Sequence, residues 1–483
     1  MNYIFDWDPK YKTAIIKCDN FSLIHEYFSI ENKMAKFAKF KNRFIPKRKY
    51  CITQNGRFDI GLLDDILKYI SSLQIPYNII ITDELKKRYN TKYDIGLYQL
   101  ISLKESLRDY QKEACQKAID KGCGVTIVGT GGGKTLIAAT LIETLRKNNA
   151  ANLTLMIVPT IQLVEQSYKD FIDYGVDPDI LSKWSGDNIL NPNAKIIIAG
   201  LSILQSEKTD LAILGKVDLL IIDEAHSIRR ENISNNLFKN ITTRHRFGMT
   251  GTLPESKLDE WNIIGKIGPI TYEKKSHELQ DEHYISTSKA VIIKIEYKNT
   301  PDYSKDKLFD DPTIMYEEEL EFLYNQPFRN LLLSKICQKL DNNILVMVDR
   351  IKHGEELFKN ISSFASNKKV YFIRGEVDIE EREKIRNLME VENNIVCIAI
   401  SKIFATGINI RNLHYIMFAA SGKAKVRIIQ SIGRGLRLHE NKDQLVIYDI
   451  ADDLIYGRKH FDRRMELYES EKIKTEIREI AEQ

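Results

Sequence analysis

A glycine-rich run followed by a lysine and a threonine is the clearest chemical feature of the chain. The run Gly129-Thr130-Gly131-Gly132-Gly133-Lys134-Thr135 lies between an apolar segment that ends at Val128 and the helical pattern LIAATLIETL. Glycines let backbone N–H groups surround phosphate oxygens, and a helix N-terminus adds partial positive charge. We expect Lys134 to reach nucleotide phosphates and the Thr135 hydroxyl to bind Mg²⁺. The run predicts a phosphate loop, although Val128 stands where the strict pattern has glycine.

A second motif places two adjacent carboxylates directly after a strand-like apolar run. The run 217–222 is followed by Asp223-Glu224-Ala225-His226. In α/β folds the carboxyl ends of buried strands are where ligands bind. By itself an Asp-Glu pair after a strand is more often a solvated helix start. Downstream of a phosphate loop, the pair predicts that Asp223 holds Mg²⁺ and that Glu224 orients and deprotonates an attacking water.

Two arginines far downstream could complete the same chemistry. Arg434 and Arg437 follow Gln430 and are three residues apart, which puts them on one face of a helix. Guanidinium groups stabilise the charge that develops on a transferring phosphoryl group. The alternative is a pair of surface arginines held in salt bridges. If they act on the nucleotide, they do so from a different domain.

The elements that must position these residues form two series of short apolar runs with amphipathic stretches between them, the pattern of doubly wound parallel sheets. The predicted strands are Val125–Val128, Leu153–Val158, Ile196–Ala199, Leu219–Ile222 and Phe247–Met249, then Ile344–Val348, Val370–Ile373, Ile395–Ile400, Tyr415–Phe418 and Leu445–Tyr448. We predict an α/β fold with two such domains at residues 99–285 and 286–455. A small α+β domain at 1–98 precedes them, and a C-terminal helical extension at 456–483 follows.

Composition sets the broad class of protein. The 483 residues carry a net charge of only +4 and a 43% hydrophobic fraction, which excludes a disordered or collagen-like chain. The six cysteines form no CxxC pair, the N-terminus lacks a signal-peptide pattern, and no apolar run reaches the ~20 residues that span a bilayer. These features predict a soluble cytoplasmic protein without a membrane partner. Any nucleic-acid contact must use local charge, because the total charge is nearly balanced.

One segment has such local charge. Residues 33–50 contain eight basic side chains and no acidic one, with four aromatic residues between them. Cations neutralise phosphates, and aromatic rings can stack on bases. The alternative is a solvated basic face whose aromatic residues lie in the core of the small domain. The nucleic-acid contacts predicted here are Lys39, Lys41, Arg43, Lys47 and Arg48.

The motifs, in this order, resemble those of superfamily 2 helicases of the DEAH-box type over about residues 100–450. The resemblance implies two RecA-like domains, and it implies that ATP and Mg²⁺ are used. It assigns catalysis to Lys134, Asp223, Glu224, Gln430, Arg434 and Arg437, and ATP contacts also to Gln111, His226, Thr135 and residues 129–133. Mg²⁺ would be held by Thr135 and Asp223. Coupling is assigned to Thr250 and Thr252, and gripping of the nucleic-acid backbone to Pro159, Thr160, Gly200, Thr406 and Gly407.

Within that superfamily the chain is most similar to the phage UvsW-type recombination and repair helicases. The likeness rests on the segments 58–63, 315–318 and 329–330 and on the C-terminal helix. It implies a monomeric motor that translocates on DNA without sequence preference, migrates junctions and regresses forks in replication, recombination and repair. It also implies recombination or single-strand-binding proteins as partners, in the host cytoplasm if the chain is phage-encoded.

Three other functions remain open from the residues alone. The core motifs do not separate a DNA helicase from an RNA helicase or a transcript-release motor. The chain could also be the ATP-dependent motor subunit of a larger nucleic-acid complex. A module that binds ATP without hydrolysing it is disfavoured by the presence of Glu224 and of both arginines.

Overall fold

The computed structural model describes most of the chain, and every structural statement below concerns these residues. They are 1–32, 35, 46–93, 98–186, 190–205, 212–301, 312–374, 379–401, 410–420, 436, 442 and 444–482. Their contacts divide the chain into two compact units, Met1–Val128 with Gly133–Lys274, and Gly129–Gly132 with Lys275–Gln483. The domain boundaries expected at 98, 285 and 455 remain predictions.

The N-terminal region has the predicted α+β composition. Its four-stranded sheet has the order β5-β2-β1-β6, in which β1 pairs antiparallel with β2 and parallel with β6. The strands are β1 Asn2–Asp8, β2 Thr13–Cys18, β5 Arg57–Phe58 and β6 Asn78–Ile81, and a separate hairpin joins β3 Ser29–Glu31 to β4 Arg48–Tyr50. The helices are α1 Phe21–Tyr27, the 3₁₀ turn η2 Ile60–Leu62, α2 Leu63–Ser72 and α3 Asp83–Tyr89.

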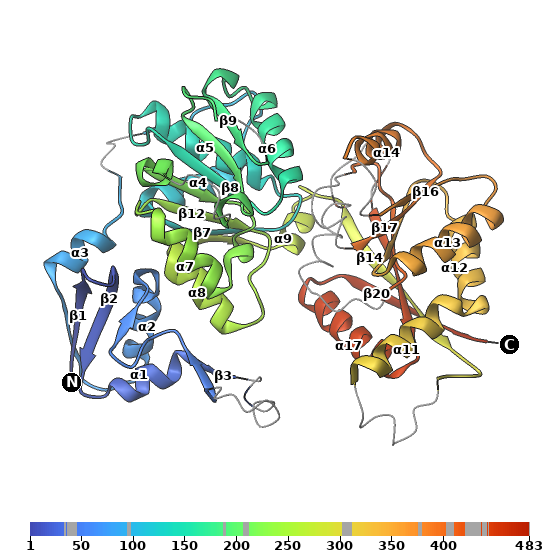
Figure 1. Cartoon of the computed structure of the whole chain (residues 1–483), viewed down its shortest axis with the longest axis horizontal. Helices are drawn as coiled ribbons and strands as arrows, with labels where there is room; N and C mark the ends of the chain where they lie inside the picture. Colours follow the sequence, from blue (N-terminus) through green and yellow to red (C-terminus); the bar gives the residue numbers. More distant parts are fainter. Residues whose placement is uncertain are drawn as a thin grey trace. The chain divides into compact units, whose positions relative to one another are not determined.

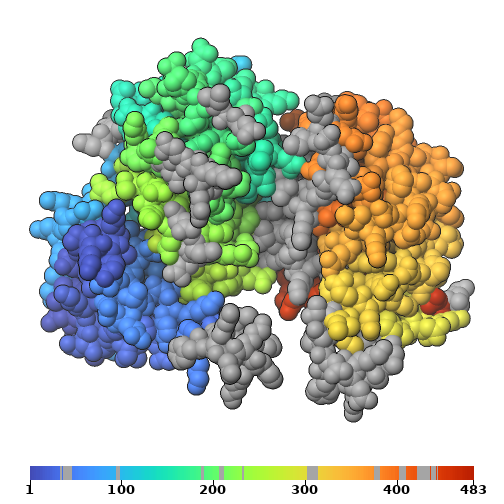
Figure 2. All heavy atoms as spheres, in the orientation of Figure 1, coloured from blue at the N-terminus to red at the C-terminus, as the bar shows by residue number. Residues whose placement is uncertain are grey.

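This region packs directly on helix α8, Lys257–Ile267, of the next domain. Trp261 and Ile264 of α8 belong to the same buried cluster as the core of the N-terminal sheet. A β-carbon at Gly61 would lie 2.0 Å from the carbonyl oxygen of Ile264, so only glycine allows the two backbones to approach this closely. Lys266 also pairs with Asp59 at 2.7 Å. These contacts explain why the N-terminal region and the first large sheet form one compact unit (Figure 2).

The first large sheet is parallel throughout and has the order β13-β7-β12-β11-β8-β10-β9 (Figure 1). Its strands are β7 Gly124–Val128, β8 Thr154–Val158, β9 Leu181–Trp184, β10 Ile196–Gly200, β11 Leu219–Ile222, β12 Arg246–Thr250 and β13 Ile270–Lys274. The helices of this unit are α4 Asp109–Lys121, α5 Lys134–Lys147, α6 Ile161–Asp173, α7 Glu231–Asn240 and α8, with 3₁₀ turns η3 Pro178–Ile180, η4 Ile203–Gln205, η5 Ala212–Lys216 and η6 Ala225–Ile228. The five strands predicted from apolar runs are all present.

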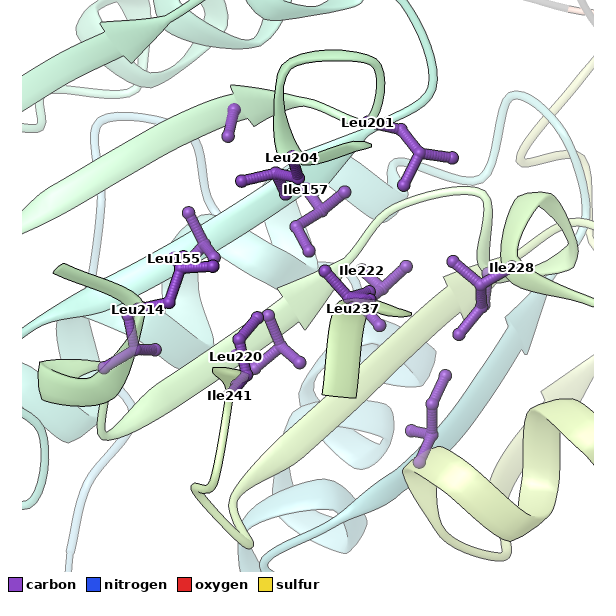
Figure 3. Packing of buried hydrophobic residues seen from close by; sticks show 14 of the residues in the cluster. Leu155, Ile157, Leu201, Leu204, Leu214, Leu220, Ile222, Ile228, Leu237 and Ile241 are labelled. Atoms are coloured by element: carbon purple, nitrogen blue, oxygen red, sulfur yellow. The ribbon is translucent and has the colours of Figure 1, made fainter. Parts of the chain in front are cut away.

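An aliphatic layer supports the centre of this sheet. Figure 3 shows Leu155 and Ile157 of β8 beside Leu220 and Ile222 of β11, on the face of the sheet that the η4, η5 and α7 segments cover. These four side chains are fully buried. The residues that follow β11 therefore start from a strand whose end is fixed by close packing.

The second large sheet is also parallel throughout, with the order β16-β17-β15-β18-β19-β14-β20. Its strands are β14 Thr287–Glu296, β15 Ile344–Val348, β16 Lys369–Ile373, β17 Ile395–Ile400, β18 Tyr415–Phe418, β19 Gln444–Asp452 and β20 Lys474–Ala481. The helices of this unit are α9 Ser276–Asp281, α11 Pro312–Asn325, α12 Pro327–Lys339, α13 Ile351–Phe364, α14 Ile379–Val391 and α17 Ile455–Ser470. Two parallel sheets flanked by helices confirm the predicted α/β fold with tandem RecA-like domains.

The C-terminal extension is a helix for only part of its predicted length. The helix predicted within 456–483 is α17, but the chain then turns and adds β20 to the edge of the sheet beside β14. Lys474–Ala481 is rich in residues of high helix propensity, which is why it resembled a helix. Backbone pairing with β14 and the ion pair Lys294–Glu479 across the two strands outweigh that weak preference.

Two buried arginines attach helices to the second sheet. Arg464 of α17 forms two hydrogen bonds of 2.7 Å with the carboxylate of Asp449 on β19, and Tyr468 donates a third bond to the same carboxylate. Arg329 of α12 binds Asp452, also on β19, at 2.8 Å. Arg464 is buried, so it is not available for contact with phosphates in solution and serves to pack its helix on the second sheet.

We predict that Arg464→Met lowers the free energy of unfolding by about 3–5 kcal/mol, because it leaves the Asp449 carboxylate buried without its cation. Arg463→Met is the matched control, since Arg463 is the exposed neighbour on the same helix. Urea denaturation of both variants and of the unmodified protein measures the difference. Equal stability of the two variants would contradict this assignment.

Among the described residues, no helix is both long enough and apolar enough to cross a membrane.

Candidate nucleotide-binding and catalytic site

The phosphate loop connects the end of β7 to the start of α5. Gly131 and Gly133 have φ values of 86° and 76°, in the left-handed region that favours glycine. Gly133 is the residue before the first turn of α5, so the positive end of the helix dipole lies at the loop. Lys134 opens the helix, and its Nζ donates a hydrogen bond of 3.4 Å to the carbonyl oxygen of Val128. The predicted strand–loop–helix context is therefore present.

Gln111 lies against this loop. Its Oε1 accepts a hydrogen bond of 2.9 Å from the backbone N–H of Arg108, the residue that precedes α4, and so fixes the amide. The Nε2 end would lie 2.4 Å from a β-carbon at position 133. The structure thus brings Gln111, one of the predicted ATP contacts, next to Gly133 and gives a second reason why that position is glycine.

The acidic pair follows β11 at the carboxyl edge of the same sheet. The backbone N–H of Asp223 donates to the carbonyl oxygen of Ile157 on β8, and its Oδ1 accepts from the N–H of Glu224, both at 2.9 Å. Glu224 has φ 48° and ψ 57°, a left-handed conformation that is uncommon for a residue with a side chain. Such a conformation costs about 1–3 kcal/mol and persists only where the surroundings impose it.

The electrostatics of the pair suit a cation. Burial, and next the charge of Glu224, raise the pKa of Asp223 to about 6, while the charge of Lys134 acts in the opposite direction. Glu224 Oε1 is 4.0 Å from Lys134 Nζ. Two carboxyl groups thus share one lysine, and a bound divalent ion would add the positive charge that they lack. The oxygen donors Thr135 and Asp223 are of the kind that Mg²⁺ prefers.

His226 links the acidic pair to the next strand. Its Nδ1 lies 3.3 Å from Glu224 Oε2 and 3.2 Å from the Thr250 hydroxyl at the end of β12. The Thr250 hydroxyl donates its own proton to the carbonyl oxygen of Thr252, at 2.8 Å. His226 Nδ1 must therefore carry a proton to form its bond with that hydroxyl. The sequence placed His226 with the nucleotide and Thr250 and Thr252 with coupling, whereas the structure joins all three residues in one hydrogen-bonded chain.

The residues predicted to grip nucleic acid lie at the ends of two neighbouring strands. Pro159 and Thr160 follow β8, and the Thr160 hydroxyl accepts a bond of 3.4 Å from the N–H of Leu163 at the start of α6. Gly200 is the last residue of β10, which pairs with β8. These residues share the carboxyl edge of the sheet with Asp223.

Of the remaining predicted positions, only two lie among the described residues. Lys47 is exposed, whereas Arg48 of β4 donates to the Ser29 hydroxyl at 2.8 Å. The other positions lie outside the described residues: Lys39, Lys41, Arg43, Thr406, Gly407, Gln430, Arg434 and Arg437.

Comparison with known proteins decides the family. The model named "Type III restriction enzyme, res subunit" matches residues 104–255, and "Helicase conserved C-terminal domain" matches residues 327–439. Together the two models match more than half of the chain. The chain belongs to the superfamily 2 helicases. This helicase is therefore an ATP-hydrolysing enzyme, as its motifs predicted.

Two relatives and one solved structure show the range of the likeness. The helicase is 28% identical over 352 residues to the ATP-dependent DNA helicase uvsW of Enterobacteria phage T4, covering 71% of this chain and 68% of the relative. It is 25% identical over 429 residues to the DNA 3'-5' translocase XPB2 of Sulfurisphaera tokodaii, covering 79% and 91%. The structure of the ATP-dependent Type ISP restriction-modification enzyme LlaBIII bound to DNA shares the fold, with a TM-score of 0.58, 15% identity and coverage of 88% and 36%.

We predict that Asp223→Asn stabilises the protein at neutral pH when nucleotide and metal are absent. A carboxyl whose pKa rises from 3.8 to about 6 on folding destabilises the folded state above pH 6, by about 3 kcal/mol at 1.36 kcal/mol per unit. This penalty declines as the pH falls from 6 and disappears below 3.8. Thermal denaturation from pH 4 to 8 should show a difference between variant and unmodified protein that grows with pH. A variant that melts at a lower temperature at pH 8 would contradict the prediction.

Proposed function

We propose that this helicase uses ATP to move along DNA and to unwind or remodel branched DNA. The observation that carries the proposal is that the carboxyl edge of one sheet holds two sets of residues. Lys134, Asp223 and Glu224 suit ATP chemistry, and Thr160 and Gly200 suit contacts with a sugar–phosphate backbone. The two relatives described above are named for action on DNA, which supports DNA as the substrate.

In this proposal the residues near the carboxyl edge of the first sheet each have a task in ATP hydrolysis. Lys134 binds the nucleotide phosphates, Gln111 recognises the adenine, and Thr135 and Asp223 hold Mg²⁺. Bound Mg²⁺ would offset the negative charge on the phosphates. Glu224 orients a water molecule and accepts its proton. His226 supports Glu224 through the close approach of its Nδ1 to Glu224 Oε2, at 3.3 Å.

Residues that the sequence analysis assigns to the second predicted domain complete the proposed cycle. Arg434 and Arg437, with Gln430, stabilise the charge that develops on the transferred phosphoryl group. Thr406 and Gly407 contact the sugar–phosphate backbone, together with Pro159, Thr160 and Gly200. Contacts of this kind carry no sequence information, so movement along the strand is independent of sequence.

The setting follows from the same proposal. We expect the helicase to act as a monomer in the cytoplasm, on forks and junctions during replication, recombination and repair. Recombination and single-strand-binding proteins are its expected partners.

We predict that Lys134→Ala and Glu224→Gln each lower DNA-stimulated ATP hydrolysis at least 10²-fold, a loss typical of removing a general base. The two variants should differ in binding, because Glu224→Gln keeps the lysine that holds the phosphates. Fluorescent ATP-analogue binding and phosphate release measure the two properties. Lys147→Ala, at the exposed far end of the same helix α5, is the control and should behave like the unmodified protein. Normal turnover in both site variants would refute the assignment.

The polynucleotide is tested separately. We predict that forked and four-way-junction DNA stimulate ATP hydrolysis more than structured RNA of equal length does, and that forked DNA yields separated or reannealed strands. A panel of fork, junction, duplex, single-stranded DNA and structured RNA, scored for phosphate release and strand products, measures this. Stronger stimulation by RNA would replace the proposal with an RNA helicase.

A further inference from the structure

A large pocket lies at the amino edge of the first sheet, opposite the nucleotide site. Its walls include Cys123, Arg246 and Pro269, which stand at the amino ends of β7, β12 and β13, and residues of β1, β2 and η2 from the N-terminal region. The pocket has a volume of about 680 Å³, within the range of ligand sites. It belongs entirely to one compact unit, so its walls are held together by the contacts of Gly61 and Lys266 described above.

The lining of this pocket is strongly basic. Its one acidic residue is Asp59, which Lys266 already pairs at 2.7 Å. Arg88 pairs with Glu84 on its own helix. The other basic lining residues are Lys10, Lys12, Lys239, Arg244 and Arg246, and among the described residues none of these five forms an ion pair with a carboxylate. Five cations that share one pocket repel one another unless an anion joins them.

Arg246 shows that the cavity is built around positive charge. Its guanidinium donates to the carbonyl oxygens of Thr243 and Lys266, both at 2.7 Å, and packs over the ring of Phe238 at 4.4 Å. Burial lowers its pKa to about 10, so it remains charged at neutral pH. Neutral carbonyl groups orient this cation, and the charge of Asp59 also acts on it. Asp59 is already paired with Lys266 at 2.7 Å, so positive charge remains in excess in the pocket, which favours the binding of an anion.

Aromatic side chains also line the pocket. Trp7 lies under the Arg88 guanidinium at 4.6 Å, and Tyr11, a residue that is 50% exposed, lies under the Arg57 guanidinium at 3.8 Å. The Trp7 ring thus holds one lining guanidinium in place, and guanidinium groups contact phosphates without reading the base sequence.

We propose that this pocket binds the phosphates of a second DNA strand, separate from the strand gripped at the carboxyl edge of the sheet. The inference rests on the proposed function, because it assumes that the substrate is DNA with more than one arm. The two edges of the sheet lie at opposite ends of the same β-strands, so one short segment of DNA cannot reach both edges. A site at the amino edge would hold one arm of a fork while the residues at the carboxyl edge act on the other arm.

The test compares two triple variants of the full chain. Lys10→Gln/Lys12→Gln/Lys239→Gln removes three exposed pocket lysines and leaves Arg246 in place, because its bonds to the backbone support the fold. Lys17→Gln/Lys195→Gln/Lys216→Gln is the matched control, since it removes three exposed lysines of the same unit that do not line the pocket. Melting temperatures check that both variants fold.

The measurement is the salt dependence of binding to forked DNA. Each phosphate contact contributes about 0.7–0.9 to the slope of log K against log salt. We expect the pocket variant to lose about two units of slope, and the control to keep the slope of the unmodified protein. Equal slopes for the two variants would overturn the inference.

Two further measurements separate a failure of the proposed function from a failure of this inference. If DNA does not stimulate ATP hydrolysis by the unmodified protein, the proposed function fails, while the comparison of slopes still tests the pocket. Inorganic pyrophosphate is the probe for a small-anion site. If it raises the melting temperature of the unmodified protein but not that of the pocket variant, and the slopes are equal, the pocket binds small anions and the inference is wrong.

Discussion

Two adjacent carboxyl groups opposite one lysine, with Asp223 buried and Glu224 partly buried, are the constraint on which the rest of this structure depends. Burial and the charge of Glu224 raise the pKa of Asp223, and the left-handed backbone at Glu224 adds strain. The chain maintains this arrangement because β11 lies between β8 and β12 in a parallel ladder and above a dry aliphatic layer. The strand end cannot relax without breaking that packing. In the function proposed above, this negative charge favours the binding of a divalent cation.

The same ladder explains how the acidic pair communicates with its surroundings. β11 and β12 are paired through Ile222 and Gly248, so the residues that follow both strands come out side by side. His226 follows β11 and Thr250 is the last residue of β12, and one proton at Nδ1 connects them. Glu224 Oε2 lies 3.3 Å from His226 Nδ1, and the same nitrogen lies 3.2 Å from the Thr250 hydroxyl. Adjacent strand ends thus connect the acidic pair to the segment that begins at Thr250.

The sequence predicts those features of the fold and of the candidate site that depend on residues close together in the chain. All ten strands expected from apolar runs are present, because a strand buried on both faces must be apolar along its length. β14 is not among the predicted strands: Lys289 and Lys294 bound a short apolar run, and these lysines pair with Glu476 and Glu479 of β20. In the candidate site, motif spacing selected Gln111, Lys134 and Asp223. It did not show that Gln111 caps its own helix or that His226 contacts Thr250, since both facts depend on how distant segments meet.

The distribution of charge on the folded protein also cannot be predicted from local sequence alone. A net charge of +4 and one basic segment near residue 40 are what the linear sequence offers. The basic pocket combines side chains from about residues 10, 88, 240 and 266, which lie far apart in the sequence. Folding gathers them because the N-terminal region covers the amino edge of the sheet and leaves the carboxyl edge to the phosphate loop and the acidic pair. Since parallel strands separate their two ends by their full length, negative carboxylates and uncompensated cations can both persist in one small domain without neutralising each other.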